Sequence, residues 1–263
     1  MALDGSDSVT ALDGICPGTT LDGMNPDAAG TISLDEPLGT THELTSTTGL
    51  ISTGIEALDL LLPEPGWRPG TLVEWLEEGE GSGAALLVLR SAARVMRVVE
   101  GGALVVIDQR GEFYPPAASD LKIDLNRTIV VRPSTDADAL WALEQSLQCP
   151  GVAAVLCWLE ALHNLVFRRL QLAVEKGGGI GFFIRPASVR PQPSWAEVRL
   201  LVQPLPGRGP SSGRRLNLIL LRCRGGVSGG AIELEMSHET GDVHLVSQLA
   251  SATHPECQAG TFL

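Results

Sequence analysis

Residues 78–85 read E-G-E-G-S-G-A-A, a glycine-rich turn between two apolar segments. The run before it, residues 72–76, has the composition of a buried β-strand. The residues after it, 84–99, have the pattern of an α-helix. Strand, turn and helix in this order predict an α/β unit, and the same alternation recurs along most of the chain.

The same layout is typical of the phosphate-binding loop, which has the form G-x-x-x-x-G-K-[ST]. Counted back from Gly83, the first glycine position holds Glu78, and the lysine and hydroxyl positions hold Ala84 and Ala85; Gly81 lies between them. The missing lysine charge is worth about 4 kcal/mol against one phosphate charge at an effective dielectric near 20. We therefore expect a degenerate phosphate loop, no cofactor and no ATPase activity. The alternative is an ordinary glycine-rich turn between a strand and a helix.

Length and composition fit one large α/β domain with tails, since the chain has 263 residues and 44% of them are hydrophobic. No apolar run reaches the roughly 18 residues of a transmembrane helix. The first forty residues contain no Lys or Arg and no apolar signal core, so a cytoplasmic protein is expected. The five cysteines have no metal-type spacing, which predicts reduced thiols and no metal site. They are Cys16, Cys149, Cys157, Cys223 and Cys257.

The predicted organisation has three parts. Residues 1–45 are acidic, repeat Leu-Asp-Gly three times at a spacing of nine, and read as a disordered tail. A linear motif or a cation-binding repeat is the alternative for the triplets. Residues 46–225 form the predicted core domain, and residues 226–263 a hairpin with an acidic tail.

Within the core, apolar runs alternate with helical patterns. Strands are predicted at residues 71–76, 103–107, 128–132, 152–157 and 180–184, and helices at 55–62, 84–99, 116–121, 136–147 and 159–175. This alternation predicts a doubly wound, mainly parallel sheet. After residue 196, strands at 198–203, 215–223, 232–236 and 243–246 follow one another without helices, which predicts an antiparallel C-terminal extension.

Charge is strongly segregated along the chain, whose net charge is −12. Residues 163–225 carry 11 Lys and Arg against 2 Asp and Glu, hence +9. Such a segment is a candidate surface for DNA or an acidic partner, and the alternative is pairing with the chain's own acidic face. The candidate contacts are Arg168, Arg169, Arg185, Arg190, Arg199, Arg208, Arg214 and Arg215.

Two further candidates come from this region of the sequence. Trp195 offers a ring that stacks on a base, although a core tryptophan at the start of a strand is the favoured interpretation. Glu160 and His163, three residues apart in the predicted helix 159–175, form a candidate acid/base pair, for which a solvated helix face is the favoured alternative.

A family resemblance rests on several motifs in order. Residues 51–62 read I-S-T-G-I-E-A-L-D-L-L-L and residues 67–76 read W-R-P-G-T-L-V-E-W-L. These segments resemble the entry to the core of the bacterial RecA recombinases, and the likeness covers about residues 46–225. At the matching positions, RecA's catalytic glutamate is replaced by Arg110 and the Walker B aspartate by Trp158. The resemblance therefore implies a RecA-like fold that has lost its catalytic groups.

Within the RecA superfamily, the chain is similar to the ImuA group, the SulA-like accessory proteins of mutagenic translesion synthesis. The segments that carry this likeness are D-A-L-W-A-L-E-Q at 138–145, R-R-L-Q-L-A at 168–173 and G-F-F-I-R-P at 181–186. The resemblance implies a protein of the SOS response to DNA damage that acts through protein–protein interaction.

The same resemblance implies partners. They are a Y-family polymerase homologue and an error-prone replicative-type polymerase, with RecA and single-stranded DNA as further candidates. RecA's DNA-contacting loop corresponds here to residues 185–194, which contain three prolines that stiffen it, so strand exchange is not expected. The alternatives are a RecA-type ATPase or recombinase paralogue, and a DNA-binding module that uses residues 163–225.

Overall fold

The computed structural model describes residues 49–79, 81–160, 162–207, 213–225, 228–237 and 242–249. The predicted tail over residues 1–45, with its Leu-Asp-Gly triplets, lies outside the described residues. So do Arg208 and the acidic tail beyond residue 249. The predicted domain boundaries therefore stay predictions.

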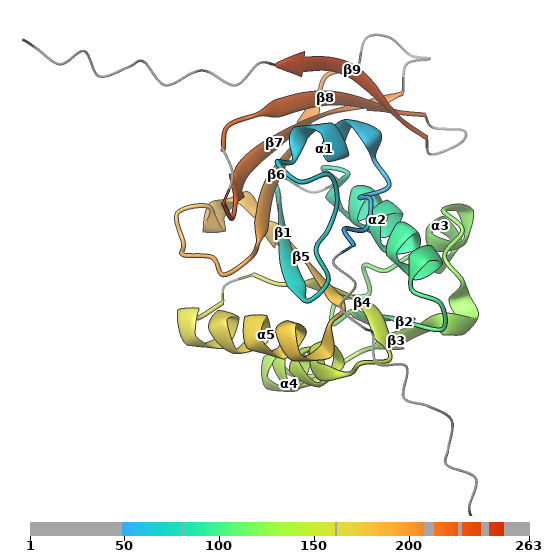
Figure 1. Ribbon diagram of the computed structural model, residues 1–263, viewed down its shortest axis with the longest axis vertical. Helices are drawn as coiled ribbons and strands as arrows, with labels where there is room; N and C mark the ends of the chain where they lie inside the picture. Colours follow the sequence, from blue (N-terminus) through green and yellow to red (C-terminus); the bar gives the residue numbers. More distant parts are fainter. Residues whose placement is uncertain are drawn as a thin grey trace, which may run out of the picture. The chain divides into compact units, whose positions relative to one another are not determined.

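Across these described ranges, the strands form a nine-stranded sheet in the order β3-β2-β4-β5-β1-β6-β7-β8-β9 (Figure 1). The first six strands are β1 (Thr71–Glu77), β2 (Ala103–Ile107), β3 (Thr128–Val131), β4 (Val152–Trp158), β5 (Ile180–Pro186) and β6 (Val198–Leu205). They pair in parallel, and their buried positions are mainly apolar. The last three are β7 (Arg214–Cys223), β8 (Ala231–Met236) and β9 (Val243–Leu249), which pair antiparallel.

The predicted mainly parallel sheet with an antiparallel extension is thus confirmed, with one difference at β6. This strand was expected in the extension but pairs in parallel with β1, on the side opposite to β5. The connection between β5 and β6, residues 187–197, therefore crosses over β1. Parallel strands require such a crossover of about a dozen residues, and here it contains only the short 3-10 helix η2 (Ala187–Val189). We call residues 187–197 the crossover segment.

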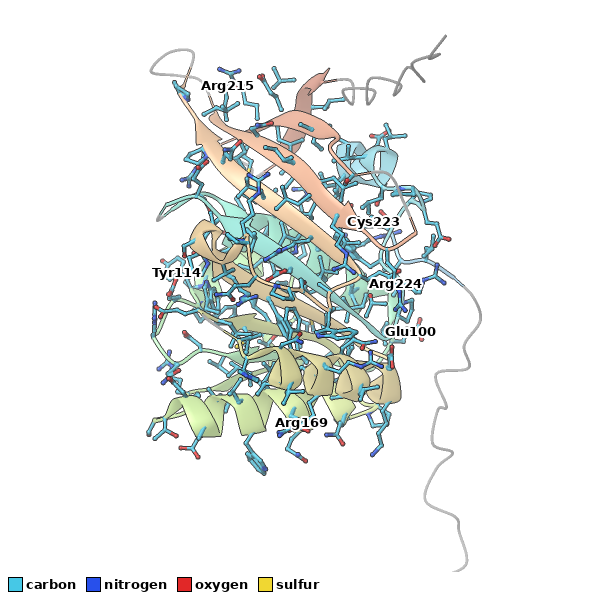
Figure 2. The ribbon with its side chains drawn as sticks, turned by 90° about the vertical axis from the view of Figure 1, so that its left-hand side faces the viewer. Glu100, Tyr114, Arg169, Arg215, Cys223 and Arg224 are labelled. Atoms are coloured by element: carbon cyan, nitrogen blue, oxygen red, sulfur yellow. The ribbon has the colours of Figure 1, made fainter. Side chains whose placement is uncertain are left out.

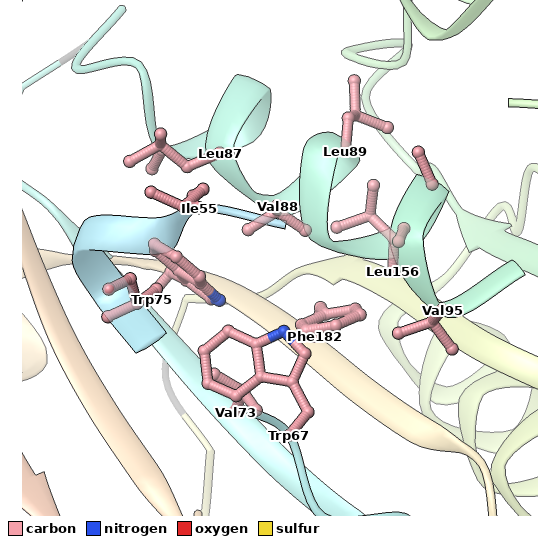
Figure 3. Close-up of a cluster of buried hydrophobic side chains, with 14 of the residues drawn as sticks. Ile55, Trp67, Val73, Trp75, Leu87, Val88, Leu89, Val95, Leu156 and Phe182 are labelled. Carbon is pink, nitrogen blue, oxygen red and sulfur yellow. The ribbon is translucent and has the colours of Figure 1, made fainter. Parts of the chain in front are cut away.

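Helices cover both faces of the sheet (Figure 1). One face carries α1 (Glu56–Leu61), α2 (Ala84–Val98) and α3 (Pro115–Asp120), and the other carries α4 (Asp136–Gln148) and α5 (Asn164–Gly177). Figure 3 shows the core under α2, where Trp67 lies edge-on to Trp75 and Phe182 at ring distances of 6.1 and 6.0 Å. Side chains of β1 alternate between the faces, since Trp75 packs with α2 and Leu72 packs with α5.

The segment before β1 is held to α2 by its own polar groups. Asp59 in α1 accepts hydrogen bonds from Ser52 Oγ at 2.6 Å and from the Thr53 amide at 2.8 Å. Arg90 of α2 donates to the Gly54 carbonyl at 3.1 Å, where Gly54 has a φ of +80°. The residues of the I-S-T-G…L-D pattern therefore have a structural role, because their hydrogen bonds hold the segment before β1 against α2.

The start of α5 differs from the sequence prediction. The helix was expected from residue 159 but begins at Asn164, because β4 continues to Trp158 and the Leu159 amide donates to the Ile184 carbonyl at 2.9 Å. His163 is the N-cap residue, and its Nδ1 accepts from the Leu165 amide at 3.4 Å. Glu160 and His163 therefore do not lie on one helix, and the candidate acid/base pair, which the sequence did not favour, loses the helix that was expected to bring its side chains together.

Candidate functional site

The glycine-rich turn joins β1 to α2, as the sequence predicts. Gly79, Gly81 and Gly83 all have positive φ values, of +83°, +66° and +95°. Only glycine adopts this conformation without strain. Three left-handed residues in five positions bend the chain sharply, so that α2 starts directly over the carboxyl end of β1.

Protein groups occupy the start of α2. Ser82 is fully buried, and its hydroxyl accepts a hydrogen bond from the Ala84 amide at 3.2 Å. The same hydroxyl donates to Glu77 Oε2 at 3.2 Å. Amide groups at a helix N-terminus are the ones that bind phosphate in nucleotide sites, and here one of them is already bonded to a side chain next to a carboxylate.

Side chains of the antiparallel extension pack on this turn. A Cβ on Gly83 would lie 3.0 Å from Leu216 Cδ1 and 3.3 Å from Met236 Cε. Arg214 Nη2 lies 3.5 Å from the place of a Cβ on Gly81. Leu216 of β7 and Met236 of β8 thus pack against Gly83, and Arg214 of β7 lies close to Gly81. The close approach to Gly83 leaves little room for a side chain at that position.

Glu78, at the position of the first phosphate-loop glycine, belongs to a hydrogen-bonded row. Gln203 Nε2 of β6 donates to Glu78 Oε2 at 2.5 Å, and Asn217 Nδ2 of β7 donates to Gln203 Oε1 at 3.0 Å. The row ties the end of β1 to β6 and β7. It also holds the negatively charged Glu78 side chain at the position where a phosphate-binding loop has a glycine.

The other two positions matched to lost catalytic groups lie near one another. Arg110 follows β2, Trp158 ends the neighbouring strand β4, and Arg110 forms an ion pair with Glu160 just beyond that strand. The hydrogen bond that Arg110 donates to the Glu160 carboxylate raises the pKa of Arg110 above its usual value. Both charged side chains are more than half exposed, so the pair is a surface contact of small energy.

Asp108, by contrast, is buried and was missed as a structural residue. Its two carboxylate oxygens accept hydrogen bonds from the backbone amides of Glu112 at 2.8 Å and Phe113 at 3.2 Å. It therefore shapes the loop that presents Arg110.

Two of the predicted surface arginines are buried. Arg185 Nη1 lies 2.5 Å from Glu74 Oε1, and Arg199 Nε lies 2.7 Å from Glu74 Oε2, with side-chain exposures of 0%, 9% and 0% for Arg185, Arg199 and Glu74. We call these three residues the buried charge cluster. Burial lowers the pKa of Arg199, an effect that the Glu74 charge opposes and the Arg185 charge reinforces.

The buried charge cluster holds the crossover segment in place. Arg199 donates to the carbonyls of Val189, Arg190 and Gln192 at 2.9 to 3.1 Å. Arg185 donates to Gln192 Oε1 at 3.1 Å. Buried arginines that hold a loop in place cannot contact a partner. Arg185 and Arg199 are therefore not surface contacts, and their prediction as such is wrong.

Other predicted contacts are paired within the protein. Arg169 lies on the outer side of the helix pair (Figure 2) and forms an ion pair with Glu144 of α4. Arg215, at the opposite end of β7 from Cys223 (Figure 2), lies 2.8 Å from Glu233 of β8. In the part of the chain that the structure describes, three of the predicted arginines have no carboxylate within 4 Å. They are Arg168, Arg190 and Arg214.

Trp195 is 41% exposed, so its favoured interpretation as a core residue is wrong. Its Nε1 donates to Asn164 Oδ1 at 2.6 Å, and the Arg168 guanidinium lies 4.7 Å from its ring centre. The crossover segment, and not the core, carries this side chain, because β6 begins three residues later.

Cysteines and other polar groups do not gather into a metal-type cluster in the described ranges. Cys149 is exposed and Cys223 is half-buried, while burial raises the pKa of Cys157. Cys16 and Cys257 lie outside the described residues. Over the same ranges, none of the helices has the length and apolar character needed to cross a bilayer.

Comparison with known proteins finds ImuA proteins that align along most of the chain. Protein ImuA of Caulobacter vibrioides (strain NA1000 / CB15N) is 33% identical over 218 residues, which cover 76% of this chain and 87% of that protein. Protein RecA of Rhodopirellula baltica is 30% identical over 120 residues, 46% of this chain and 31% of that RecA. No protein-family profile matches the chain.

A shorter match is the cell division inhibitor SulA of Photorhabdus laumondii. It is 32% identical over 77 residues, which cover 29% of this chain and 44% of that SulA.

Proposed function

This chain belongs to the ImuA family, and we propose that it is a non-catalytic accessory protein of SOS-induced mutagenic translesion DNA synthesis. Both the family resemblance and the RecA-like α/β fold expected from the sequence are confirmed, the fold by the RecA relatives together with the sheet. Family membership supports a part in damage-induced mutagenesis. The absence of catalysis is our own proposal.

The glycine-rich turn is the observation that carries this proposal. A nucleotide would require free amide groups, a lysine and a Mg²⁺-binding hydroxyl at the start of α2. The turn offers instead Ser82 bonded to the Ala84 amide, alanine at both key positions, and the carboxylates of Glu77 and Glu78. Carboxylates repel phosphate, and Leu216 and Met236 pack against the same turn. These features favour a structural connection between β1 and α2 over a nucleotide-binding site.

The function then rests on contacts with other proteins in the cytoplasm. The partners that we propose are a Y-family polymerase homologue and an error-prone replicative-type polymerase, with RecA and single-stranded DNA as further candidates. Several of the basic side chains are bonded within the chain, Arg169 to Glu144 and Arg215 to Glu233 among them. This internal pairing supports a protein adaptor over a module that binds DNA through the whole segment 163–225.

Isothermal titration calorimetry of the full chain with Mg-ATP tests nucleotide binding, and an assay of phosphate release tests catalysis. We expect no heat of binding and no phosphate release with or without single-stranded DNA, while a RecA protein run in parallel gives both. Binding of ATP at micromolar affinity would favour the alternative, a RecA-type ATPase, and would refute the proposal.

Co-purification tests the adaptor role separately. The full chain, the chain lacking residues 1–45 and the chain lacking residues 226–263 are each mixed with the two polymerases. Retention of a polymerase by the full chain is expected, and failure of the full chain to retain either one contradicts the adaptor role whatever the calorimetry shows.

A further inference from the structure

The outer side of α5 carries leucines where a surface helix usually has polar residues. The inner side of this helix packs into the core through Phe167 and Leu170. On the outer side, Leu165 is 71% exposed and Leu172 is 48% exposed. None of the described elements lies over this side of the helix pair (Figures 1 and 2). Because the two leucines are two helical turns apart on one face, they form a stripe that is open to another helix.

The apolar surface continues onto α4. Glu144 of α4 forms an ion pair with Arg169, which lies one turn before Leu172 in α5. Trp141, one turn before Glu144 in α4, is 65% exposed. Large apolar side chains that gather over two neighbouring helices indicate an interaction surface, whereas single exposed ones need no explanation.

Two charges of opposite sign lie on either side of Leu172. Arg168 is four residues before it and Glu175 is three residues after it, so the three side chains share one helix face. Among the described residues, neither charge has an oppositely charged group within 4 Å. Arg168 lies over the ring of Trp195, and Gln171 donates a hydrogen bond to Glu175. These contacts restrain both side chains but leave both charges without an ion-pair partner.

The order of these charges matches a second copy of the same helix that runs in the opposite direction. If two such helices cross near Leu172, Arg168 of each copy lies opposite Glu175 of the other, because both charges are about two-thirds to one turn plus a residue from the crossing point. The twofold axis repeats the contact, so all four charges gain a partner. Glu175, in the last turn of its own helix, then lies towards the N-terminal half of the other helix, whose dipole favours a negative charge.

We propose that this chain forms a twofold symmetric dimer in which α5 packs antiparallel against α5 of a second copy, centred on Leu172. A segment of one charge sign would pair with Arg168 or with Glu175, but not with both. A second copy necessarily carries both charges at the matching spacing. Self-association is independent of the proposed accessory function and adds to it, because a dimer presents each partner-binding surface twice.

The dimension of the face predicts a weak dimer. The two helices have 13 and 14 residues, hence lengths of about 20 Å, and packed helices lie about 8 to 10 Å apart. A face of this size is at the small end of specific interfaces. We therefore expect monomers and dimers to exchange at micromolar concentrations.

Analytical ultracentrifugation of the full chain, from about 1 to 200 μM, tests the proposal. Arg168→Glu alone and Glu175→Arg alone each put like charges opposite one another at both symmetric contacts, and should weaken the dimer about tenfold or more. The double variant Arg168→Glu/Glu175→Arg restores opposite charges in reversed order, so it should dimerise again. Leu172→Asp places a carboxylate at the centre of the apolar contact and should give a monomer.

Matched controls lie on the opposite face of the sheet. They are Leu60→Asp, at an exposed leucine of α1, and the charge reversals Arg97→Glu and Glu100→Arg, at exposed residues near the end of α2. All three should sediment as the wild type does, and circular dichroism checks that every variant is folded.

The proposal is overturned if the wild type stays monomeric, if Leu172→Asp dimerises normally, or if the double variant does not recover the dimer that each single change weakens. A monomeric wild type whose retention of a polymerase is lost in Leu172→Asp assigns this face to that polymerase, and also overturns the proposal. Retention of polymerases by the wild-type chain, which tests the adaptor role, is a separate measurement and does not depend on the sedimentation results.

Discussion

Replacing Glu74 with glutamine should destabilise the protein more than any surface substitution. The change keeps the shape of the side chain but removes the negative charge between Arg185 and Arg199, which are 0% and 9% exposed. Removing one partner from a buried ion pair costs about 3 to 5 kcal/mol, because a buried charge is left uncompensated. Both arginines retain carbonyl acceptors on Glu160 and on the crossover segment. We therefore expect the lower end of this range.

Urea unfolding followed by circular dichroism measures the loss. About 3 kcal/mol is a substantial part of the 5 to 15 kcal/mol that stabilises an ordinary domain, so the unfolding midpoint should move clearly to lower urea. The control is Glu160→Gln, which breaks the exposed pair with Arg110 and should leave the midpoint nearly unchanged. A loss below about 1 kcal/mol for Glu74→Gln, typical of an exposed pair, would falsify the assignment of a buried charge cluster.

Three other substitutions test the turn and the core. Gly83→Ala should lower the free energy of unfolding by about 1 to 3 kcal/mol, because Gly83 has a positive φ and the new Cβ would press on Leu216 and Met236. Gly79→Ala, with open space around the new Cβ, should cost less. Equal losses of stability in thermal unfolding would contradict the packing described. Ala84→Lys combined with Ala85→Thr should not create Mg-ATP binding in calorimetry, because Glu78, Ser82 and the apolar cover remain, and micromolar binding would show the turn to be open. Burial raises the pKa of Cys157, so the unfolded thiol ionises above about pH 8.5 while the folded one does not. The contribution of this group to the free energy of unfolding is therefore full below that pH and falls as pH rises, by up to about 1.4 kcal/mol per pH unit. Urea midpoints measured from pH 8 to 10 should fall less steeply for Cys157→Ala than for the wild type.

Local pattern was sufficient for the strands and for the turn. Buried parallel strands appear as uninterrupted apolar runs, so β2 is found at residues 103–107 by both routes. The start of α5 was missed because Leu159 and Leu162 continue the apolar pattern of the helix. Those two residues instead pack against the α4–α5 core from the connection that precedes the helix.

Burial of the arginines was not visible in local pattern, because it depends on pairing between distant segments. Glu74 and Arg185 are 111 residues apart in the chain. One signal was present: Glu74 interrupts the apolar run L-V-E-W-L in a strand that the sequence marks as buried. A carboxylate at such a place requires a cation, and the arginines of the neighbouring strands were the available ones.

The position of β1 between β5 and β6 has a consequence for synthesis on the ribosome. Thr71 pairs with Ile180, and Val73 pairs with Val198, so both neighbours of β1 are made more than a hundred residues after it. At about 5 to 20 residues per second, β1 waits for roughly 5 to 25 s before both neighbouring strands are made, and until then Glu74 lacks its arginines. The nascent chain thus carries an apolar strand that completes its pairing only when β6 has emerged, and unpaired strand edges of this kind make a nascent chain prone to aggregation.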